Sequence, residues 1–445
     1  MCKDKMCKDK CSCVSPDKRK CSKKYIIKCL PYTIHKPGNY CIAKDFVWSD
    51  PTKSAITVTS DNVVLDFKTR VLTTTVSSDL PLILVNGVTD VVLENIHIKA
   101  IGDAKYLSDG IEIRDSCNVV VESASLINLN VALFTDHVNG LDIDHLYLKN
   151  ELPEPSESLI LNDSENIKFH DSFTTRARCV LRQCESVDVR NIETSGLVLS
   201  ECLRVDSLNG GKNRNFDFSV PPLRISQHIR ISNNIFINAG EDIGIGILLA
   251  SFVNAIPDQP FQYPIRNVTI ENNVIQATLA IFMNADGSVA NNNTIQAFAN
   301  GFGVGGMIVG GEGNTIKNND ISALYPNGGS PNDFISWGIV HVAPQFQNLG
   351  TKYNTIDHNT VSGFTYGYTD NINFFLPNES FCTVFKNNVA YGNVTNFDIT
   401  LGAPTETVYA LDNIDACPIV PISPASVSKK VFDKSELSNL FQKLK

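Results

Sequence analysis

The sequence predicts an all-β protein in which about 13 short coils stack into a solenoid. Short β-branched segments that end in asparagine recur from residue 54 to residue 400, as in NVVLDF (62–67), NVTIENNVI (267–275) and NTIKNNDI (314–321). Helical periodicity is absent until the last dozen residues, so the repeat is built from strands and turns. Each coil must stack on its neighbours to bury its apolar side.

The coils can be aligned on the apolar residue before each turn, which we expect to point inward and call the anchor. Most intervals between anchors are 20 to 29 residues, the interval from Val189 to Val205 is shorter, and two near 40 residues imply insertions or a further coil. The Asn-Asn pairs at 233–234, 272–273, 318–319 and 387–388 fall at corners, where asparagine tolerates left-handed φ and its side-chain amides can bond along the axis. The anchors are Leu65, Leu93, Val121, Ile143, Phe169, Val189, Val205, Ile231, Ile270, Ala290, Ile316, Ile356 and Phe385.

With these features the chain resembles the right-handed parallel β-helix superfamily, the pectate-lyase-like proteins with parallel β-helix repeats. The lead-in TIHKPGNYCIAKDFVW (33–48) is similar to a segment that often precedes the first coil in such proteins. The resemblance covers residues 54–400 and implies a single-stranded right-handed parallel β-helix. It leaves function open, because the fold hosts lyases, hydrolases, epimerases, adhesins and virion spikes.

Outside the solenoid we expect three further segments. Residues 1–30 form a basic Cys-rich tail, residues 31–53 a lead-in or cap, and residues 401–445 a Pro-bearing segment that ends in an amphipathic helix. Asp433 and Glu436 are typical of a capping box, and an apolar stripe along that helix would cover the open end of the solenoid or support self-association. The stripe is formed by Leu437, Leu440, Phe441 and Leu444.

Charge is distributed unevenly within the net charge of −9. Residues 1–30 carry ten Lys and Arg against three Asp, which gives +7 for the tail and −16 for the remainder, so the body should repel nucleic acid. The longest uncharged apolar stretch, residues 243–256, has 14 residues and is too short to span a membrane. A hydrophobic share of 43% excludes wholesale disorder.

The tail gives two conflicting signals about location. Seven of the 13 cysteines lie in the first 41 residues, in a spacing that fits disulfide cross-linking or anchoring better than a zinc ribbon. The tail lacks the apolar core of a secretory signal peptide. A particle assembled in the cytoplasm and oxidised afterwards would reconcile the two, so we expect a virion, that of a large DNA virus for example, or another external surface. We interpret the N-x-S/T sequons as chance occurrences in an Asn-rich chain, at Asn162, Asn267, Asn292, Asn378 and Asn393.

One outward column of the alignment is acidic. One position past the anchor it reads Asp66, Glu94, Glu122 and Asp144, and then His170 and Arg190. Stacked carboxylates repel one another unless a cation neutralises them, and a row of oxygen ligands suits Ca²⁺. The resemblance also implies calcium, which recurs among polysaccharide lyases of this fold. The alternative is a solvated acidic face.

A second outward column is mainly apolar and reads Leu84, Glu112, Phe134, Ile160 and Val180. If it is exposed, it marks an interface rather than a wet catalytic groove. Either side-by-side packing of rods, as in a homotrimer, or a covering segment from residues 30–50 would hide it.

In the second half, insertions at 251–265, 343–352 and 371–381 follow the same strand of their coils and should form a wall. Their aromatic side chains, with Trp337 on a nearby strand, can stack on sugar rings, although packing of the loops onto the rod would explain them equally. The predicted glycan-binding residues are Phe252, Phe261, Tyr263, Trp337, Phe346, Phe374 and Phe375.

Catalytic motifs of this fold are incomplete in the sequence. AGEDIGIG (239–246) is the nearest fragment to a hydrolase carboxylate pair, but no G-H-G follows one coil later. If a catalytic site exists, we expect it beside the loop wall, at Glu241, Asp242, Asp333 and His341. His341 alternates with Val340 and Val342, so we expect it to point away from the core.

These observations favour a structural or adhesive surface β-helix that forms homo-oligomers, is anchored to a particle by its tail and binds glycans. The alternative is a polysaccharide lyase or glycoside hydrolase that acts on acidic glycans, with Ca²⁺ as the cofactor that would bridge the acidic body to such a substrate.

Overall fold

The computed structural model contains almost only parallel strands. It describes residues 24–151, 156–200, 226–238, 244–250, 265–298, 304–325, 329–331, 336–341, 351–369, 380–381, 383–399, 408–409 and 412–416. Within these residues the one helical element is a short 3₁₀ turn, η2 (Gly102–Ala104), and every strand pairing is parallel. No helix of the described chain is long and apolar enough to cross a membrane. The predicted tail (1–30, except its last residues) and the predicted C-terminal helix lie outside the described residues.

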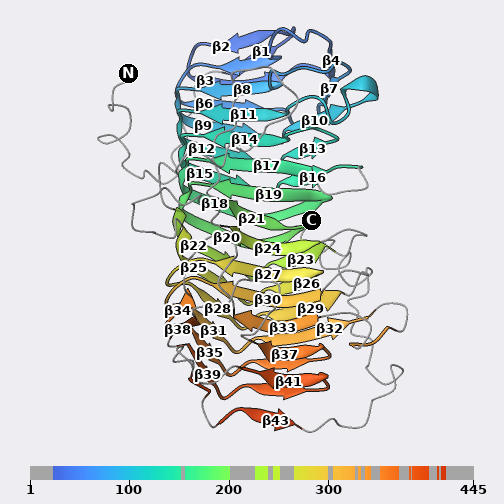
Figure 1. Cartoon of the computed structure of the whole chain (residues 1–445). Coiled ribbons are helices and arrows are strands. Elements are labelled where there is room, and N and C mark those ends of the chain that lie inside the picture. The colour runs from blue at the N-terminus through green and yellow to red at the C-terminus, as the bar shows by residue number, and fades with distance from the viewer. Residues whose placement is uncertain are drawn as a thin grey trace, which may run out of the picture.

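One face of the rod is a 14-stranded sheet in which each strand pairs with the corresponding strand of the next coil (Figure 1). We call it the 14-stranded sheet. Its strands are β2 (Tyr32–Ile34), β5 (Ile56–Val58), β8 (Ile83–Asn86), β11 (Ile111–Arg114), β14 (Leu133–Asp136), β17 (Ser156–Asn162), β19 (Ala177–Arg182), β21 (Leu197–Ser200), β24 (Ile245–Ala250), β27 (Leu279–Asn284), β30 (Val304–Gly310), β33 (Ser336–His341), β37 (Tyr366–Thr369) and β41 (Thr395–Asp398).

The other two faces are ladders that form one 27-stranded sheet, because the long strands β18 (Glu165–Thr175) and β20 (Glu185–Thr194) take part in both. The first ladder also contains β1 (Lys24–Ile27), β3 (Gly38–Ile42), β6 (Val63–Asp66), β9 (Thr89–Glu94), β12 (Cys117–Glu122), β15 (Asn139–Asp144), β22 (Ser226–Ser232), β25 (Ile265–Glu271), β28 (Val289–Asn291), β31 (Thr315–Lys317), β35 (Thr355–Asp357), β39 (Val384–Lys386) and β42 (Val408–Tyr409). The second ladder contains β4 (Phe46–Trp48), β7 (Leu72–Thr74), β10 (His97–Ala100), β13 (Ser125–Ile127), β16 (Tyr147–Lys149), β23 (Ile235–Asn238), β26 (Val274–Ala277), β29 (Thr294–Phe298), β32 (Asp320–Leu324), β36 (Thr360–Ser362), β40 (Val389–Tyr391) and β43 (Ile414–Ala416). A separate pair joins β34 (Thr351–Lys352) to β38 (Ser380–Phe381).

The register of the first ladder confirms twelve of the thirteen predicted anchors. Leu65 pairs with Leu93 and so on, anchor to anchor, to Ile356 with Phe385. The coil at Val205 is wrong, because Val189 pairs directly with Ile231 and leaves no place for a coil between them. The ladder also continues beyond the anchors, with Tyr40 beside Leu65 and Tyr409 beside Phe385.

The corners between faces follow the predicted turn chemistry. The first residue of each Asn-Asn pair has left-handed φ, for example 57° at Asn233 and 54° at Asn318. The second residue points inward and is almost completely buried. Asparagine suits the first position because it adopts positive φ at low cost, which a β-branched residue cannot do.

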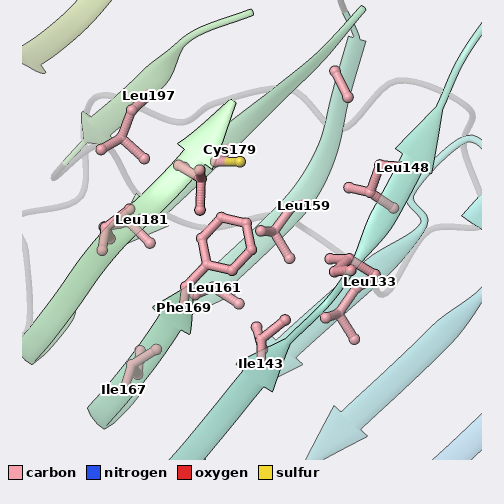
Figure 2. Close-up of a cluster of buried hydrophobic side chains, with 14 of the residues drawn as sticks. Leu133, Ile143, Leu148, Leu159, Leu161, Ile167, Phe169, Cys179, Leu181 and Leu197 are labelled. Carbon is pink, nitrogen blue, oxygen red and sulfur yellow. The ribbon is translucent and has the colours of Figure 1, made fainter. Parts of the chain in front are cut away.

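The interior between the three faces is filled by apolar side chains from every coil. Figure 2 shows one section, in which Phe169 of β18 lies among side chains from neighbouring coils, including Ile143, Leu159 and Leu181. All four are fully buried. This continuous core holds the outward columns of neighbouring coils in fixed register, so that residues far apart in sequence become surface neighbours.

Candidate functional site

The acidic column is stacked as predicted. Asp66 pairs with Glu94, Glu94 with Glu122, and Glu122 with Asp144. Asp66 is already engaged by N–H donors, since its Oδ1 accepts from the Lys68 backbone at 2.7 Å and from Asn95 Nδ2 at 3.0 Å. Among the described residues, ligand atoms of Asp, Glu, His and Cys converge in groups of three or more at the far end of the column only, at Asp144, His170 and Asp171. A calcium role for the whole column stays a prediction.

At that end, one imidazole is surrounded by three carboxylates. His170 follows Asp144 in the column, and its Nε2 lies 3.0 Å from Asp142 Oδ1. The other ring nitrogen, Nδ1, lies 2.8 Å from Asp171 Oδ2 and 3.2 Å from Asp144 Oδ1. A second imidazole approaches the same oxygen, with His145 Nδ1 2.7 Å from Asp144 Oδ1. We call Asp142, Asp144, His145, His170 and Asp171 the His/Asp cluster.

The carboxylates control the charge of this cluster. Partial burial acts to lower the pKa of His170, but the hydrogen bonds to Asp171 and Asp142 and the charge of Asp144 outweigh it and raise the pKa above its ordinary value. Burial would raise the pKa of Asp171, but the bonds from His170 and Asn191 lower it. The cluster therefore favours positive charge on or beside the His170 ring.

A similar but smaller arrangement occurs at the corner that follows the 14-stranded sheet. His137 lies between Asp136, with Nδ1 and Oδ1 3.1 Å apart, and Asp163, with Nε2 and Oδ2 2.9 Å apart. Hydrogen bonds to these two carboxylates raise the pKa of His137 to about 10. Asp136 and Asp163 come from successive coils, so His137 links two coils across the corner.

The predicted outward orientation of His341 is wrong. Its side chain is fully buried, its Nε2 lies 3.0 Å from both Asn354 Nδ2 and Thr383 Oγ1, and its ring meets Phe385 edge-on. The side chains of Val340 and His341 do alternate, but in the opposite sense to the one expected. Val340 packs with Ile308 and Trp337 outside the interior core, whereas Ile339 belongs to that core, so His341 points inward. Burial lowers the pKa of His341 to about 3, which removes the basis for a surface acid or base at this position.

The predicted apolar strip has the expected register but not the expected exposure. Leu84, Glu112, Phe134, Ile160 and Val180 pair in that order along the 14-stranded sheet. Phe134, Ile160 and Val180 are nevertheless buried within a single chain, at 7%, 2% and 0% exposure, and the Arg114 guanidinium lies 5.7 Å above the Phe134 ring. These three residues therefore do not offer the exposed trimer contact that the sequence suggested.

Further along the same sheet, the outward positions remain apolar, and all of them except Gly305 and Val340 are partly exposed. One column runs through Leu248, Phe282 and Ile308 to the buried Val340, and a neighbouring column runs through Ile245, Leu279, Gly305 and Trp337 to Tyr366. Trp337 and Ile308 pack on Val340, separately from the interior core. We call this set the C-terminal apolar face; it lies on strands β24, β27, β30, β33 and β37, whose positions Figure 1 labels.

Most of the other predicted site residues lie outside the described residues. The predicted insertions follow β24, β33 and β37, three strands of the sheet that carries the C-terminal apolar face. Glu241, Asp242 and Asp333, and the aromatic residues Phe252, Phe261, Tyr263, Phe346, Phe374 and Phe375, lie outside the described residues. Of the predicted glycan-binding set, Trp337 alone falls within the described chain, where it is half-buried on the outer face.

The sequence alignment missed Asp171, His145, Phe282 and Tyr366. Asp171 and His145 occupy the left-handed corner position, with φ of 50° and 52°, where most coils carry asparagine or serine. Reading this second column for departures from asparagine would have found them. Phe282 and Tyr366 need the strand register of the 14-stranded sheet, which the alignment of anchors did not extend to the second half.

The parallel ladders and the coil-to-coil register decide the fold. The chain has the right-handed parallel β-helix fold. No protein-family model matches it, and no curated protein sequence matches it.

Solved structures with similar folds include the A-module of a mannuronan C-5 epimerase from Azotobacter vinelandii (13% identity, TM-score 0.44, 84% of this chain and 91% of that chain). The Dettilon tailspike protein is similar over 78% of this chain, at 12% identity and a TM-score of 0.42, and the match spans 60% of that chain. A tailspike mutant of Escherichia coli bacteriophage HK620, solved with a pentasaccharide, gives 10% identity, a TM-score of 0.45, 83% of this chain and 71% of that chain.

Proposed function

We propose that this protein is a structural or adhesive surface β-helix that binds glycans through the C-terminal apolar face. The observation that carries the proposal is the group of partly exposed aromatic side chains, Phe282, Trp337 and Tyr366, on one rigid sheet. Trp337 and Tyr366 are paired on the adjacent strands β33 and β37, and Phe282 lies two strands away on β27. An aromatic ring offers an apolar face to the C–H groups of a sugar. Strands spaced about 4.8 Å apart hold such rings at fixed positions along an extended chain of sugars.

The long connections beside this face support the same proposal. The chain leaves β24, β33 and β37 by connections that are longer than the short corners of most coils, all at the same edge of the sheet. Loops on a rigid scaffold are common places for recognition. Anchoring through the basic Cys-rich residues 1–30, homo-oligomerisation, and a place on a virion or other external surface complete the proposal and rest on the sequence.

Binding is tested with the full chain on a panel of uronate polymers, alginate and neutral oligosaccharides, followed by titration calorimetry on any hit. Trp337→Ala should weaken binding about tenfold, which corresponds to about 1.4 kcal/mol, because a sugar ring would lose its stacking partner. Tyr391→Ala is the matched control, since Tyr391 is an exposed aromatic residue on the second ladder. Equal binding by both variants and the parent chain would contradict the proposed site.

The same panel separates binding from catalysis. Each polymer is incubated with the chain, with and without Ca²⁺, and unsaturated products and reducing ends are followed. Turnover of any polymer would contradict the purely adhesive function and show that the protein is a lyase or hydrolase.

A further inference from the structure

The His/Asp cluster has a hydrogen-bond arrangement that histidine metal ligands commonly show. His170 Nε2 lies 3.0 Å from Asp142 Oδ1, so the Nε2–H tautomer donates to this carboxylate. A metal-bound histidine usually donates its second ring N–H to a carboxylate in this way, which fixes the tautomer and orients the ring. The lone pair of Nδ1 then faces Asp171 Oδ2 at 2.8 Å and Asp144 Oδ1 at 3.2 Å.

Three atoms that carry lone pairs cannot share this space without a cation. Asp144 Oδ1 is shielded from solvent and has no aligned hydrogen-bond donor, although two imidazole rings approach it. A carboxylate oxygen that is shielded and left without a donor is costly. Either a proton on Nδ1 or a metal ion between the three atoms would satisfy the arrangement.

We propose that Asp144, His170 and Asp171 bind a divalent transition-metal ion of the Zn²⁺ class, with Asp142 orienting His170. Their ligand atoms lie within 4.8 Å of one another, close enough for small rotations to bring each to the roughly 2.0–2.2 Å that Zn²⁺ takes to nitrogen and oxygen. The imidazole nitrogen favours this class over Ca²⁺, which takes oxygen ligands alone. Three protein ligands leave one position for water or a ligand oxygen.

The chain contains an internal comparison in the same column, several coils closer to the C-terminus. Asp357 occupies the position of Asp144 and is followed by His358, as Asp144 is followed by His145. The next coil, however, supplies Lys386 in place of His170 and Asn387 in place of Asp171. Lys386 Nζ lies 3.6 Å from Asp357 Oδ2 and Asn387 Nδ2 donates to Asp357 Oδ1 at 2.9 Å, so cationic and amide donors complete that site without a metal ion.

The repeat also supplies substitutions that the fold accommodates. Asparagine occupies the corner position of Asp171 at Asn191 and Asn233, both with left-handed φ, so Asp171→Asn keeps the backbone. Serine occupies the column position of His170 at Ser232, so His170→Ser has a precedent two coils away. Asp357→Asn is the matched control, because it removes a carboxylate from the same column outside the proposed site.

The test is titration of metal-free full chain with ZnCl₂, by calorimetry and by native mass spectrometry, for the parent chain and the three variants. We expect Asp171→Asn and His170→Ser each to lose one zinc equivalent, or to bind it at least about tenfold more weakly, and Asp357→Asn to match the parent. All variants share the Cys-rich tail, so any zinc that the tail binds cancels when the variants are compared. Zinc should raise the unfolding temperature of the parent more than that of His170→Ser.

Equal stoichiometry and affinity in all four proteins would overturn the proposal, and a protonated His170 would then account for the geometry. Equal losses in Asp357→Asn would also overturn it, by showing diffuse attraction to an acidic surface. Circular dichroism of each variant checks that the β-helix is intact.

Discussion

The two halves of the rod fill the same inner corner in different ways. Between the first and second ladders, the N-terminal half places mostly apolar side chains just after the turn, at Ile96, Ala124, Leu146 and Ile192. The C-terminal half places buried asparagines there, from Asn234 to Asn388. Each asparagine amide donates to the side-chain oxygen of the next, at 2.9 to 3.1 Å, and to a backbone carbonyl, in a ladder that ends at Asn413.

This difference shows that the corner geometry does not require one chemistry. An apolar corner needs only to pack, so each of its residues contributes separately. An amide ladder satisfies every buried polar group only while it is continuous, so its members depend on one another. The C-terminal half should therefore be more sensitive to a single substitution at this corner than the N-terminal half.

The largest expected effect is the interruption of the ladder by Asn319→Leu. Asn319 donates to Ala290 O and Asn359 Oδ1 and accepts from the backbone and side chain of Asn293, all at 2.9 to 3.0 Å. Leucine would remove these four bonds. Asn359 Oδ1 would keep the backbone N–H of Asn319, at 3.0 Å, but Ala290 O and the two donors of Asn293 would each lose a buried partner, at about 1–3 kcal/mol each, so we expect a loss of at least about 3 kcal/mol. Thermal unfolding and hydrogen exchange of β31 and β32 measure it.

The neighbouring Asn318→Gly is the control for this experiment. Asn318 is exposed and has φ of 54°, which glycine adopts without strain. Its side chain donates to Asn291 Oδ1 at 3.0 Å on the exposed surface, so the loss of this bond should cost less than about 1 kcal/mol. If Asn319→Leu were no more damaging than Asn318→Gly, the ladder would not be cooperative.

The next largest effect is a loss of folding stability at acidic pH, which we expect in the C-terminal half. The unfolded chain protonates His341 near pH 6.5, whereas burial in the folded chain lowers its pKa to about 3. Stability is therefore complete above pH 6.5 and falls by about 1.4 kcal/mol per pH unit below it, or about 2 kcal/mol by pH 5. Unfolding measured from pH 7 to 5 should show this loss, and hydrogen exchange should locate it near β33.

His341→Val tests the assignment of this pH dependence. Valine occupies the paired position on β30 at Val309, so the interior accommodates it. The variant loses the polar contacts of the ring with Asn354 and Thr383 and should be less stable at pH 7, but its stability should change less between pH 7 and pH 5. An unchanged slope would place the acid sensitivity elsewhere.

The sequence predicted the register better than it predicted exposure. Twelve anchors and the column from Asp66 to Asp144 are placed correctly, because a repeated apolar residue before a turn fixes stacking whatever the side chains do outside. His341 was misplaced because Val340, which was taken to point inward, packs outside the interior core with Ile308 and Trp337. Alternation alone does not say which of two neighbouring residues faces the core. Ile160 and Val180 are buried because they pack in one cluster with Val131 and Phe134 of neighbouring coils, a contact that the pattern within one strand does not encode.

A candidate site could be predicted from the sequence when all of its residues occupy one aligned position of the repeat. The acidic column was read from one aligned position, but the His/Asp cluster combines two positions with a third residue, Asp142, on the same strand. The residues of the cluster therefore come from three different aligned positions, and examining one position at a time does not show that they lie together. The C-terminal apolar face was missed for a similar reason. Its columns can be recognised only when the pairing of the 14-stranded sheet is known, for example the pairing of Gly305 with Leu279 and Trp337.

The smallest expected effect is an alkaline loss confined to the N-terminal half. In the folded chain Asp136 and Asp163 raise the pKa of His137 to about 10, above its ordinary value of 6.5. Its stabilising contribution is therefore complete below pH 6.5 and is lost as the pH rises through 10, the reverse of His341. The side chain is 54% exposed, so solvent and salt screen the pair and we expect a fall of only about 1–2 °C in Tm.

His137→Asn is the variant for this test, because asparagine tolerates the left-handed φ of 54° at this corner. Measured between pH 8 and 10.5 in low salt, the parent should lose more stability than the variant, and 1 M NaCl should reduce the difference. Hydrogen exchange should place the change at β14 and β17 and leave the asparagine ladder unaffected. A loss that persists in high salt, or that appears in the C-terminal half, would show that the ion pairs of His137 do not couple these two coils.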